Sequence, residues 1–289
     1  LELSRAVQRV LIRPEVSGVV VTQPADNIEE TAYFVSISLS DVFQNQNSKP
    51  IVFTTCMNPE DPMFDGTKNL LDSIRVACHD VKGDIPTVVV CMNGEIHAAS
   101  RAQLTHTNKA SALASPGWGP VGYVDRDNVY FRCGALELDT GLNFPMLKKL
   151  TAKVPVVKAM CGDDGALLEM VLEKEPDAII VEGFGRGNLP AGMMPAIKKA
   201  VKKGIFVVIS TRASSGRVLD STVFPGSVAQ CLESGCLLAG ETTTAKARLL
   251  LMYVLSQKEA IQLKKEDPER FFAYVQECLD PVLTNRLFG

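Results

Sequence analysis

Histidine and tryptophan are scarce in this chain of 289 residues, which has three histidines and one tryptophan. Neither the histidines (His79, His97 and His106) nor the cysteines form a pair with the spacing of a zinc site. Cys231 and Cys236 enclose four residues, but no second pair completes a tetrahedral set of ligands. We therefore expect these cysteines to pack as small apolar side chains and we expect no bound metal.

Long apolar runs and an excess of charge of one sign are also lacking. No stretch reaches the ~18 apolar residues of a membrane-spanning helix, and the first residues do not have the pattern of a secretory signal. The formal net charge is −3 and the basic residues are scattered, which excludes an electrostatic footprint for nucleic acid. Five of the eight cysteines lie in apolar segments, which predicts free thiols in a reducing, cytoplasmic setting.

What the chain does have is a regular alternation of short β-branched segments with longer helical patterns. This rhythm is typical of a parallel sheet with helices on both faces, and it predicts an α/β fold. The predicted strands are residues 18–22, 50–55, 87–92, 155–160, 178–182 and 205–210. The predicted helices are residues 27–39, 67–77, 164–173, 195–201, 227–234 and 243–255.

The alternation breaks around residues 125–143. Residues 123–132 have the pattern of an antiparallel hairpin that turns on Asp127 and Asn128, and an irregular stretch follows. We place the domain boundary there. The prediction is an N-terminal α/β domain at residues 1–135, a linker at 136–152, and a second, smaller α/β domain at 153–289.

In an open parallel sheet, ligands bind beyond the carboxyl ends of the strands, where loops and helix N-termini meet. Three prominent loops of this kind are at residues 22–30, 55–66 and 93–101. The first contains Asp26, directly before a predicted helix. On local evidence we expect Asp26 to be a helix N-cap; the alternative is a carboxylate that holds the amino group of a ligand.

A glycine-rich turn follows the predicted strand at residues 178–182. Its sequence, Glu182-Gly-Phe-Gly-Arg-Gly-Asn-Leu-Pro, lacks the glycine spacing of the dinucleotide fingerprint, and no acidic residue follows at the required distance. We interpret it as a tight loop in which backbones pass closely, and we expect no cofactor.

Taken together, several segments resemble the bacterial-type L-asparaginases in an order that spans nearly the whole chain. Residues 18–34 are similar to the family segment Gly-Val-Val-Val-Thr-His-Gly-Thr-Asp-Thr-Met-Glu-Glu-Thr-Ala-Tyr-Phe. The other matching segments are residues 93–100, 119–123, 182–190, 210–212 and 246–248. The resemblance implies a flavodoxin-like N-terminal domain, a smaller C-terminal α/β domain, and homodimers or homotetramers. It also implies hydrolysis of L-asparagine to L-aspartate and ammonia by a threonine nucleophile.

The positions that match the family's functional residues have changed in this sequence. One family threonine falls on Ala25, and the lysine that helps to activate it falls on Leu104. The aspartate that holds the substrate's amino group is kept as Asp26, with Gln23 as a hydrogen-bonding neighbour and Pro24 reshaping the loop. The family's first threonine and its tyrosine flap precede the segment that matches Leu1, so we expect an N-terminal truncation.

Loss of a nucleophile or its activating base costs about 10³- to 10⁶-fold in rate. The resemblance therefore predicts an asparaginase-like protein with impaired catalysis, a pseudoenzyme whose amino-acid ligand is asparagine or aspartate. The alternatives are an amidohydrolase that uses Thr22, Thr105 or Thr107, and a non-catalytic homologue that binds an amino acid or partners an active relative. A relative that acts on tRNA-linked glutamate is disfavoured, because no basic surface or added domain is visible.

Overall fold

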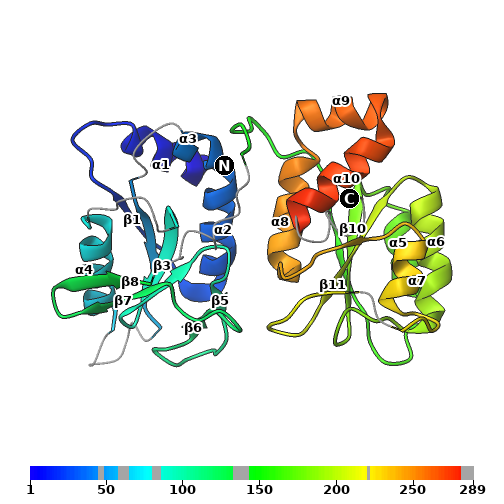
Figure 1. The fold of residues 1–289 in the computed structure, drawn as a ribbon, viewed down its shortest axis with the longest axis horizontal. Coiled ribbons are helices and arrows are strands. Elements are labelled where there is room, and N and C mark those ends of the chain that lie inside the picture. Colours follow the sequence, from blue (N-terminus) through cyan, green and yellow to red (C-terminus); the bar gives the residue numbers. More distant parts are fainter. Residues whose placement is uncertain (45–48, 58–64, 80–85, 133–142, 220–221, 281–289) are drawn as a thin grey trace. The chain divides into compact units, whose positions relative to one another are not determined.

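The chain forms two compact units, Leu1–Lys148 and Lys149–Gly289 (Figure 1). The computed structural model describes residues 1–44, 49–57, 65–79, 86–132, 143–219 and 222–280. Part of the predicted linker, residues 136–142, lies outside the described residues. No helix in the described ranges is long and apolar enough to span a membrane.

The N-terminal unit is built on a six-stranded mixed sheet. Its strands follow the order β1-β2-β3-β4-β7-β8, in which β1, β2 and β3 are parallel and the remaining neighbours are antiparallel. The strand bounds are Val19–Thr22 (β1), Ile51–Thr54 (β2), Val88–Met92 (β3), Glu95–Ala98 (β4), Gly122–Asp125 (β7) and Asn128–Phe131 (β8). Two short strands, Gln103–Leu104 (β5) and Leu113–Ala114 (β6), pair with each other in a separate sheet. The helical segments are α1 (Glu2–Leu11), η1 (Ala25–Asn27), α2 (Ile28–Ser38), α3 (Ser40–Gln44) and α4 (Gly66–Ala77).

The alternation of side chains along β2 places helices on both faces of this sheet. Ile51 and Phe53 join an apolar core with residues of α1 and α2, whereas Val52 joins a second core with Val76 of α4. Figure 1 shows α2 and α4 on opposite faces of the sheet. The prediction of strands buried on both faces is therefore confirmed for β2 and β3, while β1, at the edge of the described sheet, is only half-buried.

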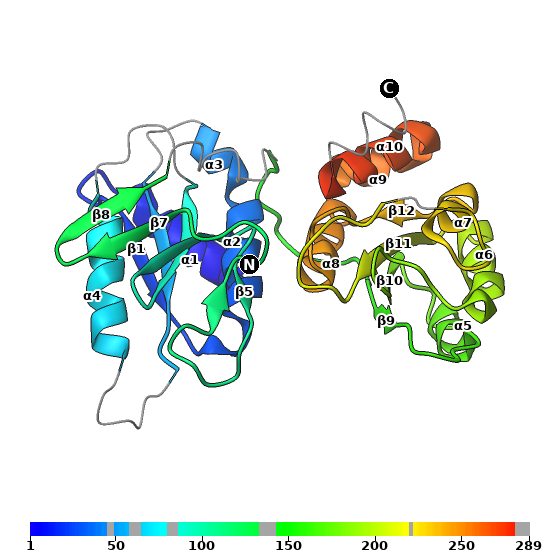
Figure 2. The same cartoon turned by 60° about the horizontal axis from the view of Figure 1, so that its bottom comes forward.

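The C-terminal unit contains a four-stranded parallel sheet in the order β12-β11-β10-β9. Its elements are β9 (Val156–Lys158), α5 (Ala166–Leu172), β10 (Ala178–Gly183), η3 (Ala191–Met193), α6 (Met194–Lys202), β11 (Phe206–Thr211), α7 (Val228–Glu233), β12 (Leu237–Leu238), α8 (Thr244–Val254), α9 (Lys258–Glu266) and α10 (Pro268–Leu279). A single apolar cluster joins α5, α6 and α7 to one face of the sheet, and in Figures 1 and 2 α8 lies on the other face.

The predicted α/β class is confirmed, and each of the twelve predicted segments contains a strand or helix of the expected type. The prediction of a loop at residues 93–101 is wrong in its first half, because Glu95–Ala98 form strand β4. Asn93 and Gly94 have φ of 53° and 78° and form a two-residue turn between β3 and β4. Asn-Gly is the preferred pair for such a hairpin turn, so the sequence itself carries the signal for this turn.

The predicted hairpin at residues 123–132 exists, but its turn lies one residue earlier than expected. Strands β7 and β8 are antiparallel, and the pair Asp125 and Asn128 closes a turn made by Arg126 and Asp127. Arg126 takes the positive φ, 53°, that the turn requires. Asn128 is therefore the first residue of β8 and not a turn residue.

Candidate functional site

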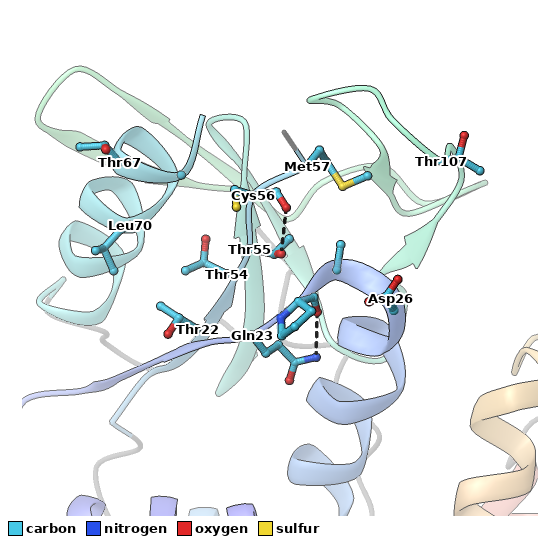
Figure 3. A pocket seen from close by; sticks show the side chains of 13 residues that line it. Thr22, Gln23, Asp26, Thr54, Thr55, Cys56, Met57, Thr67, Leu70 and Thr107 are labelled. Carbon is cyan, nitrogen blue, oxygen red and sulfur yellow. Dashed lines mark hydrogen bonds between the residues drawn. The ribbon is translucent and has the colours of Figure 1, made fainter. Parts of the chain in front are cut away.

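A cavity of about 720 Å³ opens at the carboxyl ends of β1 and β2 in the N-terminal unit (Figure 3). This is the edge at which an α/β sheet places its ligand sites. The lining residues come from the first and second predicted loops, from strand ends and from α4, with one residue from the segment after β5. They are Thr22, Gln23, Pro24, Ala25, Asp26, Thr54, Thr55, Cys56, Met57, Gly66, Thr67, Leu70 and Thr107.

The loop after β1 turns sharply because of Pro24, whose φ of −57° and ψ of 152° lead directly into the short 3-10 helix η1. Asp26 lies inside η1, and Asn27 takes the position before α2, with no side-chain cap on either helix. The expectation that Asp26 caps the helix is therefore wrong, because the chain makes one further 3-10 turn before α2 begins. The exposed Asp26 carboxylate forms no hydrogen bond or ion pair with any other described residue.

Gln23 lines the cavity but uses its amide to hold the loop. Its Nε2 donates to Asn27 Oδ1 at 3.2 Å, and Pro24 O and Thr31 Oγ1 each lie 3.4 Å away. Figure 3 shows Gln23 below the turn that contains Asp26. These contacts fix the backbone of the turn that presents the Asp26 carboxylate.

The floor of the cavity is formed by threonines at the ends of β1 and β2. Thr54 Oγ1 donates to Cys91 O at 2.8 Å, and Thr55 Oγ1 donates to Cys56 O at 3.3 Å, so both buried hydroxyls are used within the fold. The hydroxyls of Thr22 and Thr107, in contrast, form no hydrogen bond within the described part of the chain. They are available to a ligand.

Asn69 is a buried residue of α4 that joins the cavity loop after β2 to the β3–β4 turn. Its Nδ2 donates to Thr55 O at 2.9 Å, and its Oδ1 accepts a hydrogen bond from Asn93 N at 2.9 Å. This arrangement fixes the end of β2 against the β3–β4 turn. Sequence reasoning missed Asn69, although an amide on the apolar face of a predicted helix is a signal for such a role.

The structure brings together three of the four predicted site residues. Ala25, Asp26 and Gln23 line the cavity. Leu104 is half-buried in β5, does not line the cavity, and donates its backbone N–H to the Glu29 carboxylate. Whether Ala25 and Leu104 replace a catalytic pair stays a prediction.

The three threonines considered as replacement nucleophiles are placed differently. Thr22 and Thr107 line the cavity, whereas Thr105 Oγ1 donates to Ala112 O at 2.9 Å. Among the described residues that line the cavity there is no lysine, and Asp26 is the only charged side chain. The described part of the chain also has no cluster of three or more His, Cys, Asp or Glu side chains able to hold a metal ion. The cavity offers a carboxylate and hydroxyl groups, a set that suits a ligand ammonium group.

The fold and this site define a protein of two α/β units, with its candidate ligand site beyond the parallel strands of the first. Residues 1–135 match the family described as "Asparaginase, N-terminal", and residues 153–266 match "Glutaminase/Asparaginase C-terminal domain". The chain belongs to the asparaginase family, as the resemblance predicted.

Individual relatives agree with this assignment. The chain is 31% identical over 267 residues to an L-asparaginase of Bacillus licheniformis, an alignment that covers 91% of this chain and 79% of the relative. It is 27% identical to a glutaminase-asparaginase of Pseudomonas aeruginosa, over 90% of this chain and 69% of that protein. The crystal structure of a probable cytoplasmic L-asparaginase from Campylobacter jejuni has a TM-score of 0.78 and 26% identity, over 96% of this chain and 82% of that chain.

Proposed function

We propose that this asparaginase-like chain binds a free amino acid in the cavity of its N-terminal unit and that its amide hydrolysis is impaired. The observation that carries the proposal is the pair Ala25 and Asp26 on the cavity wall. A methyl group stands where the resemblance implies a threonine, next to the carboxylate that the resemblance assigns to the substrate's amino group.

Asp26 supports the binding half of the proposal. Its carboxylate is exposed at the cavity and forms no other hydrogen bond or ion pair with the described residues, so a ligand ammonium group meets no competing partner. An exposed ion pair contributes only about 0.2–1 kcal/mol. We therefore expect modest affinity, with the remaining binding energy supplied by the threonine hydroxyls and the apolar lining.

The lack of an activating group near the hydroxyls supports the impairment half. A threonine hydroxyl is a weak nucleophile unless an adjacent base removes its proton. Among the described lining residues, Thr22 and Thr107 have free hydroxyls, but no lysine or histidine lines the cavity with them. The expected rate is therefore lower than that of a complete site by about 10³-fold or more.

The runner-up function is an amidohydrolase that uses Thr22 or Thr107. The observation in its favour is that both threonines line the cavity and that their hydroxyls have no internal partner among the described residues. If this alternative holds, ammonia is released from asparagine, and Thr22→Val or Thr107→Val abolishes the release. The proposed function predicts no release above buffer for the unmodified chain.

Two measurements on the full chain test the proposal. Ammonia release from asparagine and glutamine is expected at the buffer rate, and calorimetry is expected to detect binding of asparagine or aspartate. Asp26→Asn should weaken that binding by about two- to fivefold, as an exposed ion pair implies, whereas Asp125→Asn, at an exposed carboxylate on β7 outside the cavity, should not change it. Ammonia release above the buffer rate would contradict the proposed loss of catalysis. Equal affinity of the Asp26→Asn and Asp125→Asn variants for the ligand would contradict the role of Asp26 in binding.

Absence of binding in all three proteins would leave the structural alternative, a homologue that partners an active relative.

We also propose a homodimer or homotetramer, as the family resemblance implies, and a cytoplasmic setting, which is supported by the seven described cysteines being free thiols. Light scattering of the purified chain measures the assembly. A molar mass of a monomer at micromolar concentration would contradict the proposed homodimer or homotetramer.

A further inference from the structure

We propose that Asn69 is a positioning residue of the cavity, which holds the wall formed by residues 55–57 in the geometry that a ligand meets. Figure 3 shows Thr55, Cys56 and Met57 following one another along the cavity, and all three line it, whereas Asn69 does not. The inference rests on the proposed function where it concerns ligand affinity. Its consequence for the motion of the wall is measured without a ligand.

The amide of Asn69 has one orientation that satisfies its surroundings. Its Nδ2 donates to Thr55 O at 2.9 Å and to Asp65 Oδ2 at 3.2 Å, and its Oδ1 accepts from Asn93 N at 2.9 Å. In the flipped orientation an oxygen would face two acceptors, and an amino group would face a backbone N–H. The side chain is buried, so a hydrogen bond lost here is not replaced by bulk water.

The two donated hydrogen bonds hold the cavity wall at both of its ends. One of them reaches Thr55, at the start of the wall, directly. The other reaches Asp65, whose Oδ2 also accepts from the backbone N–H of Met57, at the end of the wall, at 3.3 Å. The Thr55 hydroxyl donates to Cys56 O and therefore gives no anchor outside the wall. A change at the Asn69 amide is thus transmitted to both ends of the wall.

The accepted hydrogen bond connects the wall to the sheet. Asn93 and Gly94 form the turn that joins β3 to β4, and β3 is the neighbour of β2 in the sheet. Asn69 therefore ties the wall to a second, well-paired part of the N-terminal unit and not only to the helix that carries it. A wall held in this way keeps one geometry between binding events, which lowers the cost of ordering it around a ligand.

Two substitutions separate the hydrogen bonds of Asn69 from its volume. Asn69→Leu keeps the number of side-chain heavy atoms and removes all three hydrogen bonds. Asn69→Asp keeps an oxygen for the Asn93 N–H but has at most one donor in place of two, so at least one end of the wall is released. Asn69→Asp carries the test if Asn69→Leu does not fold.

Ser73→Ala is the matched control on the same helix. Ser73 is buried one turn further along α4, and its Oγ donates to Asn69 O at 2.7 Å, a contact within the helix. Loss of this hydroxyl removes a buried polar contact of α4 and leaves the hydrogen bonds of the Asn69 amide in place. It therefore reports the effect of a less stable helix alone.

Hydrogen exchange of the full chain without ligand tests the hold on the wall. The readout is the exchange rate of the Met57 backbone N–H relative to that of Val90, a buried residue of β3, because global unfolding accelerates both. We expect this ratio to rise at least about tenfold in Asn69→Leu, to rise in Asn69→Asp, and to stay within about twofold in Ser73→Ala. An equal ratio in the position-69 variants and in Ser73→Ala would overturn the proposal.

Calorimetry with asparagine and with aspartate tests the consequence for binding. A wall that keeps the binding geometry for a third of the time or less weakens affinity about threefold or more, and this is the loss expected in Asn69→Leu. Ser73→Ala should bind within about twofold of the unmodified chain. A ligand that binds the position-69 variants as tightly as Ser73→Ala would show that Asn69 does not position the cavity. If the unmodified chain binds neither amino acid, the proposed function fails, and the exchange of Met57 still decides whether Asn69 holds the wall.

Discussion

At the residue scale, His97 is a buried histidine that joins two segments of the N-terminal unit. Its Nδ1 lies 3.0 Å from Ser115 Oγ, and its Nε2 lies 3.3 Å from a carboxylate oxygen of Glu95. Burial lowers the pKa of His97, and the nearby Glu95 carboxylate opposes this shift. A neutral ring suits this site, because Nδ1 then accepts from Ser115 Oγ, while the buried Nε2 has no hydrogen-bond partner among the described residues.

The lowered pKa of His97 predicts a loss of stability in acid. Below pH ~6.5, the usual histidine pKa, the unfolded chain takes up a proton that the folded chain does not. The free energy of unfolding therefore falls as the pH is lowered from about 6.5 to the folded-state pKa, and levels off for this group below it. Denaturant titrations of the unmodified chain and of His97→Gln should show a weaker pH dependence in the variant.

The control is His79→Gln, which replaces an exposed histidine and should keep the slope of the unmodified chain. If the free energy of unfolding of His97→Gln depends on pH as steeply as that of the unmodified chain, His97 is not the cause of the loss of stability in acid. The comparison depends on the slope and not on the absolute stability, so any general destabilisation by replacing a buried ring does not affect it.

Residues of the candidate site were predictable where the chain itself brings them together. Gln23, Ala25 and Asp26 are close in sequence, and the end of a parallel strand indicates where their loop must lie. Asn69 and Leu70 were not predicted as site residues, because only the packing of α4 against β2 decides which helical positions reach the cavity. A local pattern does not contain this information.

At the element scale, the glycine-rich loop after β10 agrees with its interpretation as a close passage of backbones. A Cβ atom on Gly183 would lie 2.6 Å from Gly187 O, and one on Gly226 would lie 2.1 Å from Leu189 O. Leu189 N also donates to Gly226 O at 2.8 Å, so the two segments touch along their main chains. Gly226 has a φ of 87°, which a side chain makes costly.

This contact predicts a large effect of Gly226→Ala. The positive φ costs about 1–2 kcal/mol, and the clash with Leu189 O adds about 1–3 kcal/mol. Gly185→Ala is the matched control, because Gly185 has a φ of 49° but nothing within 4 Å of the added Cβ. Chemical denaturation should therefore show a loss larger by about 1–3 kcal/mol in Gly226→Ala, and equal losses would refute the backbone contact.

The type of an element could be predicted where its apolar residues repeat at helical or strand spacing over enough residues to be recognised. Helices α2, α4 and α8 span eleven or twelve residues each, and their apolar spacing places them within one residue of the predicted bounds. Strand β12 has only two residues, Leu237 and Leu238, and is defined by pairing with β11 rather than by its own pattern. Long-range pairing of this kind leaves no periodic signal in the sequence.

At the scale of the whole molecule, the two units have separate cores, and buried cysteines lie in both. In the N-terminal unit, Cys91 faces the α4 side of the sheet, and burial raises the pKa of its thiol to about 12. In the C-terminal unit, Cys231 and Cys236 belong to the cluster beneath α5, α6 and α7. A hydrogen bond between the two thiols lowers the pKa of Cys231 and raises that of Cys236.

These thiols predict the alkylation pattern of the native chain. The thiolate is the reactive form, and access limits its reaction. In iodoacetamide at about pH 8, Cys78 and Cys161 should react first, because both are exposed, and the buried Cys91, Cys231 and Cys236 should not react until the chain unfolds. The lowered pKa of Cys231 does not change this expectation, since its side chain is sealed within the apolar core.

Pulsed alkylation across a denaturant series, with peptide mass spectrometry as the readout, then follows each core separately. Cys231 and Cys236 should become reactive with one common midpoint, because one apolar cluster buries both, and Cys91 should report the N-terminal unit with a midpoint of its own. Gly226→Ala should move the midpoint of the Cys231 and Cys236 pair to lower denaturant, because its backbone contact lies in the C-terminal unit. Reaction of Cys231 under native conditions at the rate of Cys78 would contradict the sealed core, and different midpoints for Cys231 and Cys236 would contradict the single cluster.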